Sequence, residues 1–206
     1  MRALAPLLVV ALLGGCHARF KKNVGSIDHV RADMPSFGGP TVNLGMVDDD
    51  SLLGAAVNLG QAIKSEGLTQ RIGEAVRPDE VNTAFVEGLA DAMKKRPFEV
   101  RDKSRHTLQL EMLHYGIDVP GIGNPGALTY VIRSQLYKGN GKKVYKATHT
   151  CALSFAQFQP VSLATGTVNN AAAIKDMKDR ELRLLFEDGA RACAEQVVVR
   201  IRKHGG

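Results

Sequence analysis

The chain has 206 residues, which is long enough to bury one complete hydrophobic core and short enough for a single domain. Hydrophobic residues make up 44% of it and charged residues 23%, proportions that are typical of a globular protein and exclude a disordered or fibrous chain. The formal net charge is +6, but the basic residues fall in short groups at the ends of expected helices and turns. We therefore expect no nucleic-acid partner, and attraction to anionic lipid headgroups is the less favoured alternative.

The chain opens on an apolar run. Eleven residues, Ala3 to Leu13, follow the charged Arg2 and end at the small residues 14–15 and Cys16. The run is too short to cross a hydrocarbon core of about 30 Å, which needs about twenty apolar residues. A charged start, an apolar centre of this length and small residues at its end instead predict a signal peptide over residues 1–15.

The end of this segment, Leu13-Gly14-Gly15-Cys16, resembles the lipobox of bacterial lipoproteins. The resemblance implies that the Cys16 thiol takes a diacylglycerol, that the chain is cut before it, and that the new amine receives a fatty acyl group such as palmitate. Since His17 rather than Asp follows the cysteine, it also implies the outer membrane, with the body in the periplasm. An ordinary cleaved signal peptide and a cytosolic protein are the alternatives.

The next part of the chain predicts a tether, two strands and a helix. Residues 16–26 are polar and basic and would link the lipid to a single domain over 27–206. Short strands are expected at 27–31 and 41–47. Residues 48–51 supply helix caps, and calcium binding is not expected because the spacing and closing Glu of a calcium loop are missing. Apolar residues at helical spacing then predict an amphipathic helix: Leu52, Leu53, Ala56, Leu59 and Ile63.

A second helix and a run of strands follow. Pro78 begins a helix that reaches Met93 and cannot pass Pro97. Strands are expected at 98–101, 107–117, 128–137 and 144–153, and the glycine-containing turn at 138–142 joins the last two as a hairpin. Alternation in the final strand turns one set of side chains toward the core: Tyr145, Ala147, Cys151 and Leu153.

The last segment, 176–203, has the most regular helical pattern in the chain. It follows a long connection at 157–174 that shows no clear period. Its apolar positions are three or four residues apart: Leu182, Leu185, Phe186, Gly189, Ala190, Cys193, Val197 and Ile201. The order of elements predicts an α+β fold, a two-layer sandwich with a mostly antiparallel sheet, helices packed on one face, and a long C-terminal helix.

Two cysteines, Cys151 and Cys193, remain after acylation of Cys16, and both are expected to face the same interior. In an oxidising compartment they could form a disulfide, which would stabilise the fold by roughly 4 kcal/mol in the chain-entropy model. The alternative is two small buried hydrophobic side chains. The pattern leaves both interpretations open.

No pattern in the sequence predicts a catalytic, metal or cofactor site. Residues 121–126 spell G-x-G-x-x-G, but a strand is expected after them, so a hairpin loop is favoured over a dinucleotide site. The histidines include no pair four residues apart. His114 and His149 are expected on neighbouring strands, where they could meet, and a structural role is favoured for them. We therefore expect no enzyme.

The order of elements over residues 50–203 resembles that of small α/β lipoproteins that serve outer-membrane assembly. The segments that carry this resemblance are FVEGLADAMKKRPFEVRD (85–102), TLQLEMLHYGID (107–118) and LTYVIRSQLY (128–137). The families are the lipopolysaccharide-assembly lipoprotein and the auxiliary lipoproteins of lipid-trafficking ABC transporters. The resemblance implies a non-catalytic accessory or structural component of an envelope assembly or transport complex, with an envelope protein as partner, and it carries over no site residue.

Binding of lipid or another amphiphile is the alternative function. An amphiphile-binding protein would enclose an apolar cavity between sheet and helices, whereas an accessory component would have a filled core and a polar outer sheet face. The segment 52–76 distinguishes the two functions. In an accessory component it would lie flat on the sheet, whereas in an amphiphile-binding protein it would cover a cleft.

Overall fold

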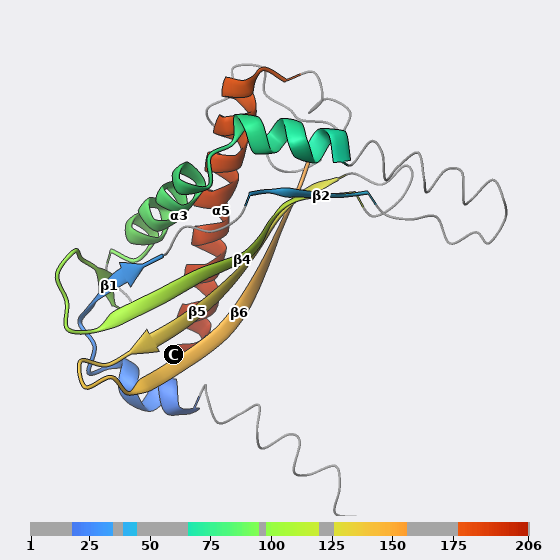
Figure 1. Ribbon diagram of the computed structural model, residues 1–206. Helices are drawn as coiled ribbons and strands as arrows, with labels where there is room; N and C mark the ends of the chain where they lie inside the picture. Colours follow the sequence, from blue (N-terminus) through green and yellow to red (C-terminus); the bar gives the residue numbers. More distant parts are fainter. Residues whose placement is uncertain are drawn as a thin grey trace, which may run out of the picture.

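The computed structural model describes residues 18–34, 39–44, 66–94, 98–119, 126–155 and 177–205, and these form one α+β body with a sheet and a helical layer (Figure 1). Several sequence predictions lie outside the described residues: the signal peptide, the lipidation site Cys16, the caps at 48–51, the helix over 52–63, the glycine pattern at 121–126 and most of the connection at 157–174. The predicted fold class is confirmed.

The described residues form a sheet of six strands: β1 (His29–Asp33), β2 (Thr41–Leu44), β3 (Glu99–Val100), β4 (Thr107–Val119), β5 (Ala127–Tyr137) and β6 (Lys143–Ser154). Five of them follow the order β3-β1-β4-β5-β6, and β2 pairs with β4. The long pairs β4–β5 and β5–β6 are antiparallel, whereas the short pairs of β1 and β2 with β4, and of β1 with β3, are parallel. The sheet is therefore mostly antiparallel, as predicted.

Side chains alternate between the two faces of the long strands. In β6, Tyr145, Cys151 and Leu153 are buried, while Lys146 and Thr148 are exposed. The register of β4 against β5 shifts between Met112 and His114, and this irregularity leaves Leu113 39% exposed. Because side chains alternate along β6, its outer face is polar: Lys146, Thr148 and Thr150 are exposed on it.

Two long helices form the second layer. Helix α5 (Asp179–Gly205) covers the inner face of the sheet, and α3 (Pro78–Ala92) packs against α5. Helix α5 begins later than the predicted residue 176, because the Glu181 carboxylate accepts a hydrogen bond from the Lys178 backbone N–H at 2.8 Å and caps the first turn. A shorter helix at 66–75 buries Ile72 and Ala75 in the same core.

Residues 18–24, which were expected to belong to a tether, form a helix that is part of the folded body. Phe20 is completely buried in the core cluster, and Val24, one turn later, packs against the same cluster. The sequence predicted a polar tether here because the apolar face of this helix consists of only these two side chains, which are four residues apart. The following strand β1 begins at His29, two residues later than predicted, although Ile27 is buried.

Candidate functional site

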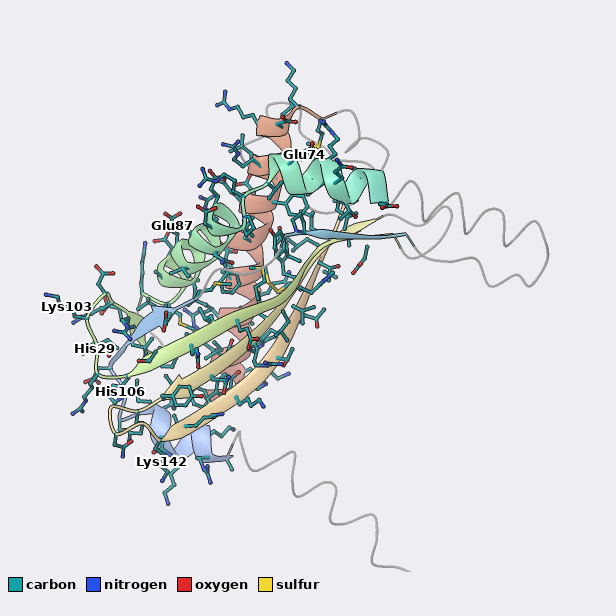
Figure 2. The ribbon with its side chains drawn as sticks, in the orientation of Figure 1. His29, Glu74, Glu87, Lys103, His106 and Lys142 are labelled. Carbon is teal, nitrogen blue, oxygen red and sulfur yellow. A yellow bond between two sulfur atoms is a disulfide. The ribbon has the colours of Figure 1, made fainter. Side chains whose placement is uncertain are left out.

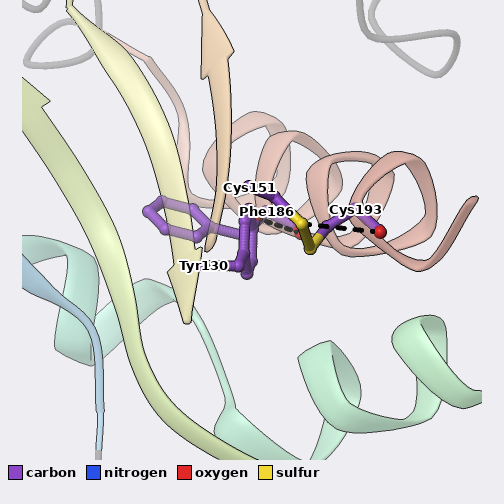
Figure 3. Close-up of a disulfide and its surroundings, with 4 residues drawn as sticks. All are labelled: Tyr130, Cys151, Phe186 and Cys193. Atoms are coloured by element: carbon purple, nitrogen blue, oxygen red, sulfur yellow. Dashed lines mark hydrogen bonds between the residues drawn. A yellow bond between two sulfur atoms is a disulfide. The ribbon is translucent and has the colours of Figure 1, made fainter. Parts of the chain in front are cut away.

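Cys151 and Cys193 are joined by a disulfide bond in the structure (Figure 3). It connects β6 to α5, with the two Cα atoms 5.6 Å apart and both residues fully buried. The bond ties the helical layer directly to the edge strand of the sheet.

The packing between α5 and the sheet is close beside this disulfide. The Tyr130 hydroxyl donates a hydrogen bond to the Phe186 carbonyl at 2.8 Å, and burial raises the pKa of Tyr130, so the hydroxyl keeps its proton (Figure 3). A Cβ atom at Gly189 would lie 2.5 Å from the Tyr130 hydroxyl and 2.9 Å from a Leu128 methyl carbon. Helix and sheet therefore leave no room for an acyl chain at this crossing.

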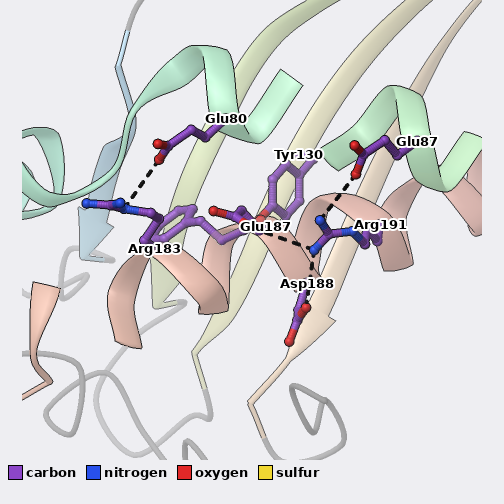
Figure 4. A network of polar contacts seen from close by, with 8 residues as sticks. Glu80, Glu87, Tyr130, Arg183, Glu187, Asp188 and Arg191 are labelled. Carbon is purple, nitrogen blue, oxygen red and sulfur yellow. Dashed lines mark hydrogen bonds and ion pairs between the residues drawn. The ribbon is translucent and has the colours of Figure 1, made fainter. Parts of the chain in front are cut away.

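A network of ion pairs connects α3 to α5 on the outer side of the helical layer (Figure 4). Arg183 lies 3.3 Å from Glu80, and Arg191 lies 3.3 Å from Glu87 and 3.8 Å from Glu187. Burial raises the pKa of Glu187, an effect that Arg191 opposes. The helices approach closely here, because a Cβ atom at Gly88 would lie 2.9 Å from the Arg191 Cα. These charges serve the packing of the two helices.

The expectation that His114 and His149 lie on neighbouring strands, where they could meet, is wrong. Strand β5 lies between β4 and β6, and His149 is on the inner face of the sheet whereas His114 is on the outer face. His149 instead lies near Tyr145 and His204, with the Tyr145 hydroxyl 3.5 Å from His149 Nε2 and 3.0 Å from His204 Nδ1. Burial, aided by Arg200 and His204, lowers the pKa of His149 to about 4.

The described residues contain neither a metal centre nor a membrane-spanning helix. No group of three or more His, Cys, Asp or Glu side chains comes together as a cation site within them. Among the helices that the structure describes, none is long and apolar enough to cross a bilayer.

The helix at 18–24 meets the last turn of α5 and the β5–β6 turn at one end of the molecule (Figure 1). The Phe20 ring lies 4.6 Å from the Tyr145 ring, measured between centroids. The Lys138 ammonium donates hydrogen bonds to the Ser26 hydroxyl at 3.0 Å and to the Asn23 side-chain oxygen at 3.4 Å. This end of the molecule is therefore a fixed arrangement of three segments that are far apart in the sequence.

Basic residues gather at this same end, which we call the basic end. Figure 2 shows Lys103, His106 and Lys142 on this side of the molecule, while Glu74 lies at the other end. Its residues come from the helix at 18–24, from β1, from the segment before β4 and from the β5–β6 turn: Lys21, Lys22, Arg31, Lys103, Arg105, Lys138 and Lys142.

Two open hollows lie side by side at the basic end and share Arg105. One, of about 670 Å³, is lined by His29, Arg31, Asp102, Lys103, Ser104 and Arg105. The other, of about 400 Å³, is lined by Ser26, Arg105, His106, Lys138, Gly139 and Asn140. The sequence offered no sign of this gathering, because its members are short groups separated by up to about 70 residues along the chain.

Comparisons with known proteins give similar structures and no family. No family model matches the chain, and neither does any curated protein. A Xanthomonas campestris protein of the family DUF330 is 17% identical with a TM-score of 0.38, over 63% of this chain and 64% of that one, just under two thirds of its length. A candidate lipoprotein from Caulobacter crescentus is 10% identical with a TM-score of 0.37, over 91% of this chain and 96% of that one. PelC from Paraburkholderia phytofirmans, a dodecamer, is 10% identical with a TM-score of 0.32, over 82% and 92% of the two chains.

Proposed function

We propose that the protein is an outer-membrane lipoprotein, anchored by acylated Cys16 and facing the periplasm. In this proposal it is a non-catalytic accessory or structural component of an envelope assembly or transport complex, it uses no cofactor, and its partner is another envelope protein. The sequence Leu13-Gly14-Gly15-Cys16 after an apolar run is the observation that carries the proposal.

The fold supports this proposal through the place where the chain enters it. The described part of the chain starts at residue 18, in the helix at 18–24, two residues after position 16, and Phe20 within this helix is completely buried. A lipid on Cys16 would therefore lie within a few ångströms of the folded body, because each residue spans at most about 3.6 Å. Two or more acyl chains suffice for stable anchoring, so the body needs no apolar patch of its own.

The packing of the body supports an accessory role over amphiphile binding. Around Tyr130 and Gly189 the space between α5 and the sheet is filled, and the described part of the segment 52–76 buries Ile72, Ala75 and Val76 in the core. The outer face of β6 is polar and exposed, which leaves it open to a protein partner, because a non-obligate interface is about as polar as the rest of a protein surface.

Acylation is tested by expressing the full chain in its own cells and measuring the intact mass of the purified protein. We expect a chain that starts at Cys16 and carries the added mass of a diacylglycerol and a fatty acyl group. The Cys16→Ser variant should lose this mass and leave the outer-membrane fraction. An unprocessed start methionine, or a trimmed terminus without lipid, would contradict the proposal.

The accessory role is tested by cross-linking in cells followed by purification of the lipidated protein. We expect one envelope protein to co-purify in constant ratio, and depletion of the lipoprotein to leave an envelope assembly incomplete or its lipid distribution altered. Phospholipid or another amphiphile that co-purifies in constant ratio with the mature protein, without a protein partner, would favour the alternative function.

A further inference from the structure

The basic end carries a large excess of positive charge on exposed side chains. Six of its seven basic residues are exposed, and Lys138 is half-buried. The carboxylates of Asp28, Glu99 and Asp102 lie in the same part of the molecule, where Glu99 pairs with Arg101, and the seven basic residues outnumber these carboxylates. Such an excess on one end of a molecule attracts a negatively charged surface.

The exposed lysines of this end are not neutralised by the body. The ion pairs that join the two helices, such as Arg183 with Glu80, lie in the helical layer. Within the part of the chain that the structure describes, Lys21, Lys22, Lys103 and Lys142 form no ion pair with a carboxylate. Their charges therefore act outward.

The arrangement of these charges is held in place by the fold. The Ser104 hydroxyl donates a hydrogen bond to the His29 carbonyl at 2.8 Å, and the Gly139 backbone N–H donates one to His106 Nδ1 at 3.2 Å. Burial, together with the positive charges of Arg105 and Lys138, lowers the pKa of His106. The loop that carries Lys103 and the turn that carries Lys142 are thus joined through a neutral histidine.

We propose that the basic end binds the anionic headgroups of a phospholipid bilayer. The charges come from several separate segments and surround open hollows, so they match an array of phosphates spread over a surface better than one small anion. The orientation of this end toward the bilayer rests on the proposed function, because the helix at 18–24 follows the proposed anchor. The affinity for headgroups does not depend on the anchor.

The test measures binding of the mature chain, residues 16–206 with Cys16→Ser, to phosphatidylcholine vesicles with and without phosphatidylglycerol. Because this chain carries no acyl group, the result is the same whether or not Cys16 is lipidated in the cell. We expect binding only when phosphatidylglycerol is present, and weaker binding as salt increases. Each basic residue near the surface accounts for about a fivefold change in the partition coefficient, so Lys103→Gln with Lys142→Gln should weaken binding about 25-fold.

The matched control is Lys178→Gln with Arg180→Gln, which removes the same charge from exposed residues at the opposite end of α5. It should change vesicle binding by less than about twofold, the change expected when charges lie more than a Debye length from the surface. Circular dichroism would verify that both double variants are folded. Equal binding with and without phosphatidylglycerol, equal losses in the two double variants, or retention on a soluble polyanion such as heparin without vesicle binding would each overturn the proposal.

Discussion

Gly189 shows how a single residue sets the distance between helix and sheet. A methyl group at this position would meet the Tyr130 hydroxyl at 2.5 Å, and the backbone beside it accepts the hydrogen bond of that hydroxyl at Phe186. Glycine costs about 1 kcal/mol in a helix relative to alanine, so its presence here reflects the close approach rather than helix propensity.

We predict that Gly189→Ala lowers the free energy of unfolding by about 2 kcal/mol, because overpacking a filled core costs more than the helix gains. Urea unfolding would measure it. Gly73→Ala is the matched control, since nothing lies within 4 Å of its added Cβ and it should stabilise by up to about 1 kcal/mol. Adding Tyr130→Phe to Gly189→Ala should recover part of the loss, whereas fully additive losses would contradict a direct clash.

His149 should make the stability of the protein depend on pH. At pH 7 its imidazole is neutral in both the folded and the unfolded chain. Below pH 6.5, the ordinary pKa of a histidine side chain, the unfolded chain binds the proton first, because burial holds the pKa of His149 in the folded chain at about 4. The free energy of unfolding should therefore fall as the pH decreases from 6.5 toward 4, by about 2 kcal/mol at pH 5 from this residue.

Urea unfolding at pH 7 and pH 5 measures this effect, and His149→Gln should show a smaller loss between the two values. Some dependence should persist in the variant, because burial also lowers the pKa of His106. An unchanged pH dependence in His149→Gln would show that the His149 side chain is already protonated or accessible in the folded state.

At the scale of elements, the disulfide joins β6 and α5 across a segment of 42 residues that includes the long connection. A bridge over a loop of this length stabilises by about 4 kcal/mol in the chain-entropy model, because it restricts the unfolded chain. We predict that the double variant Cys151→Ala, Cys193→Ala loses about this much, as measured by urea unfolding. Adding reductant during unfolding should lower the midpoint of the wild type and leave that of the variant unchanged. A wild-type midpoint that does not respond would mean that the cysteines are not bridged.

At the scale of the whole molecule, the sequence predicted the periodic helices and strands, but it did not predict which segments far apart in the chain contact each other. The stripe of α5 and the alternation of β6 are repeated over many residues, so single exceptions do not hide them. Phe20 is one aromatic residue in a basic segment, and its burial depends on Tyr145 and on the end of α5, which lie far along the chain. His114 and His149 are separated because β5 pairs with both β4 and β6. The turn at 138–142 predicted the pairing of β5 with β6, but no local pattern placed β4 on the other side of β5.

The basic end could not be predicted for the same physical reason. Lys142 and its neighbour flank a turn, as expected, but the residues around that turn do not encode its tertiary position. The hairpin packs beside the helix at 18–24 and beside the loop before β4. Because of this packing, pairs of charges that are separate in the sequence form one surface.

The position of Gly205 beside the Phe20 ring has a consequence for chain connectivity, since a side chain built there would lie 3.1 Å from that ring. A short glycine linker from residue 205 back to residue 18, with the chain reopened in the exposed 139–141 turn, should give a circular permutant with the same circular-dichroism spectrum and cooperative unfolding. For the same reason, the lipid proposed at Cys16, attached instead near residue 205, would lie at the same end of the molecule.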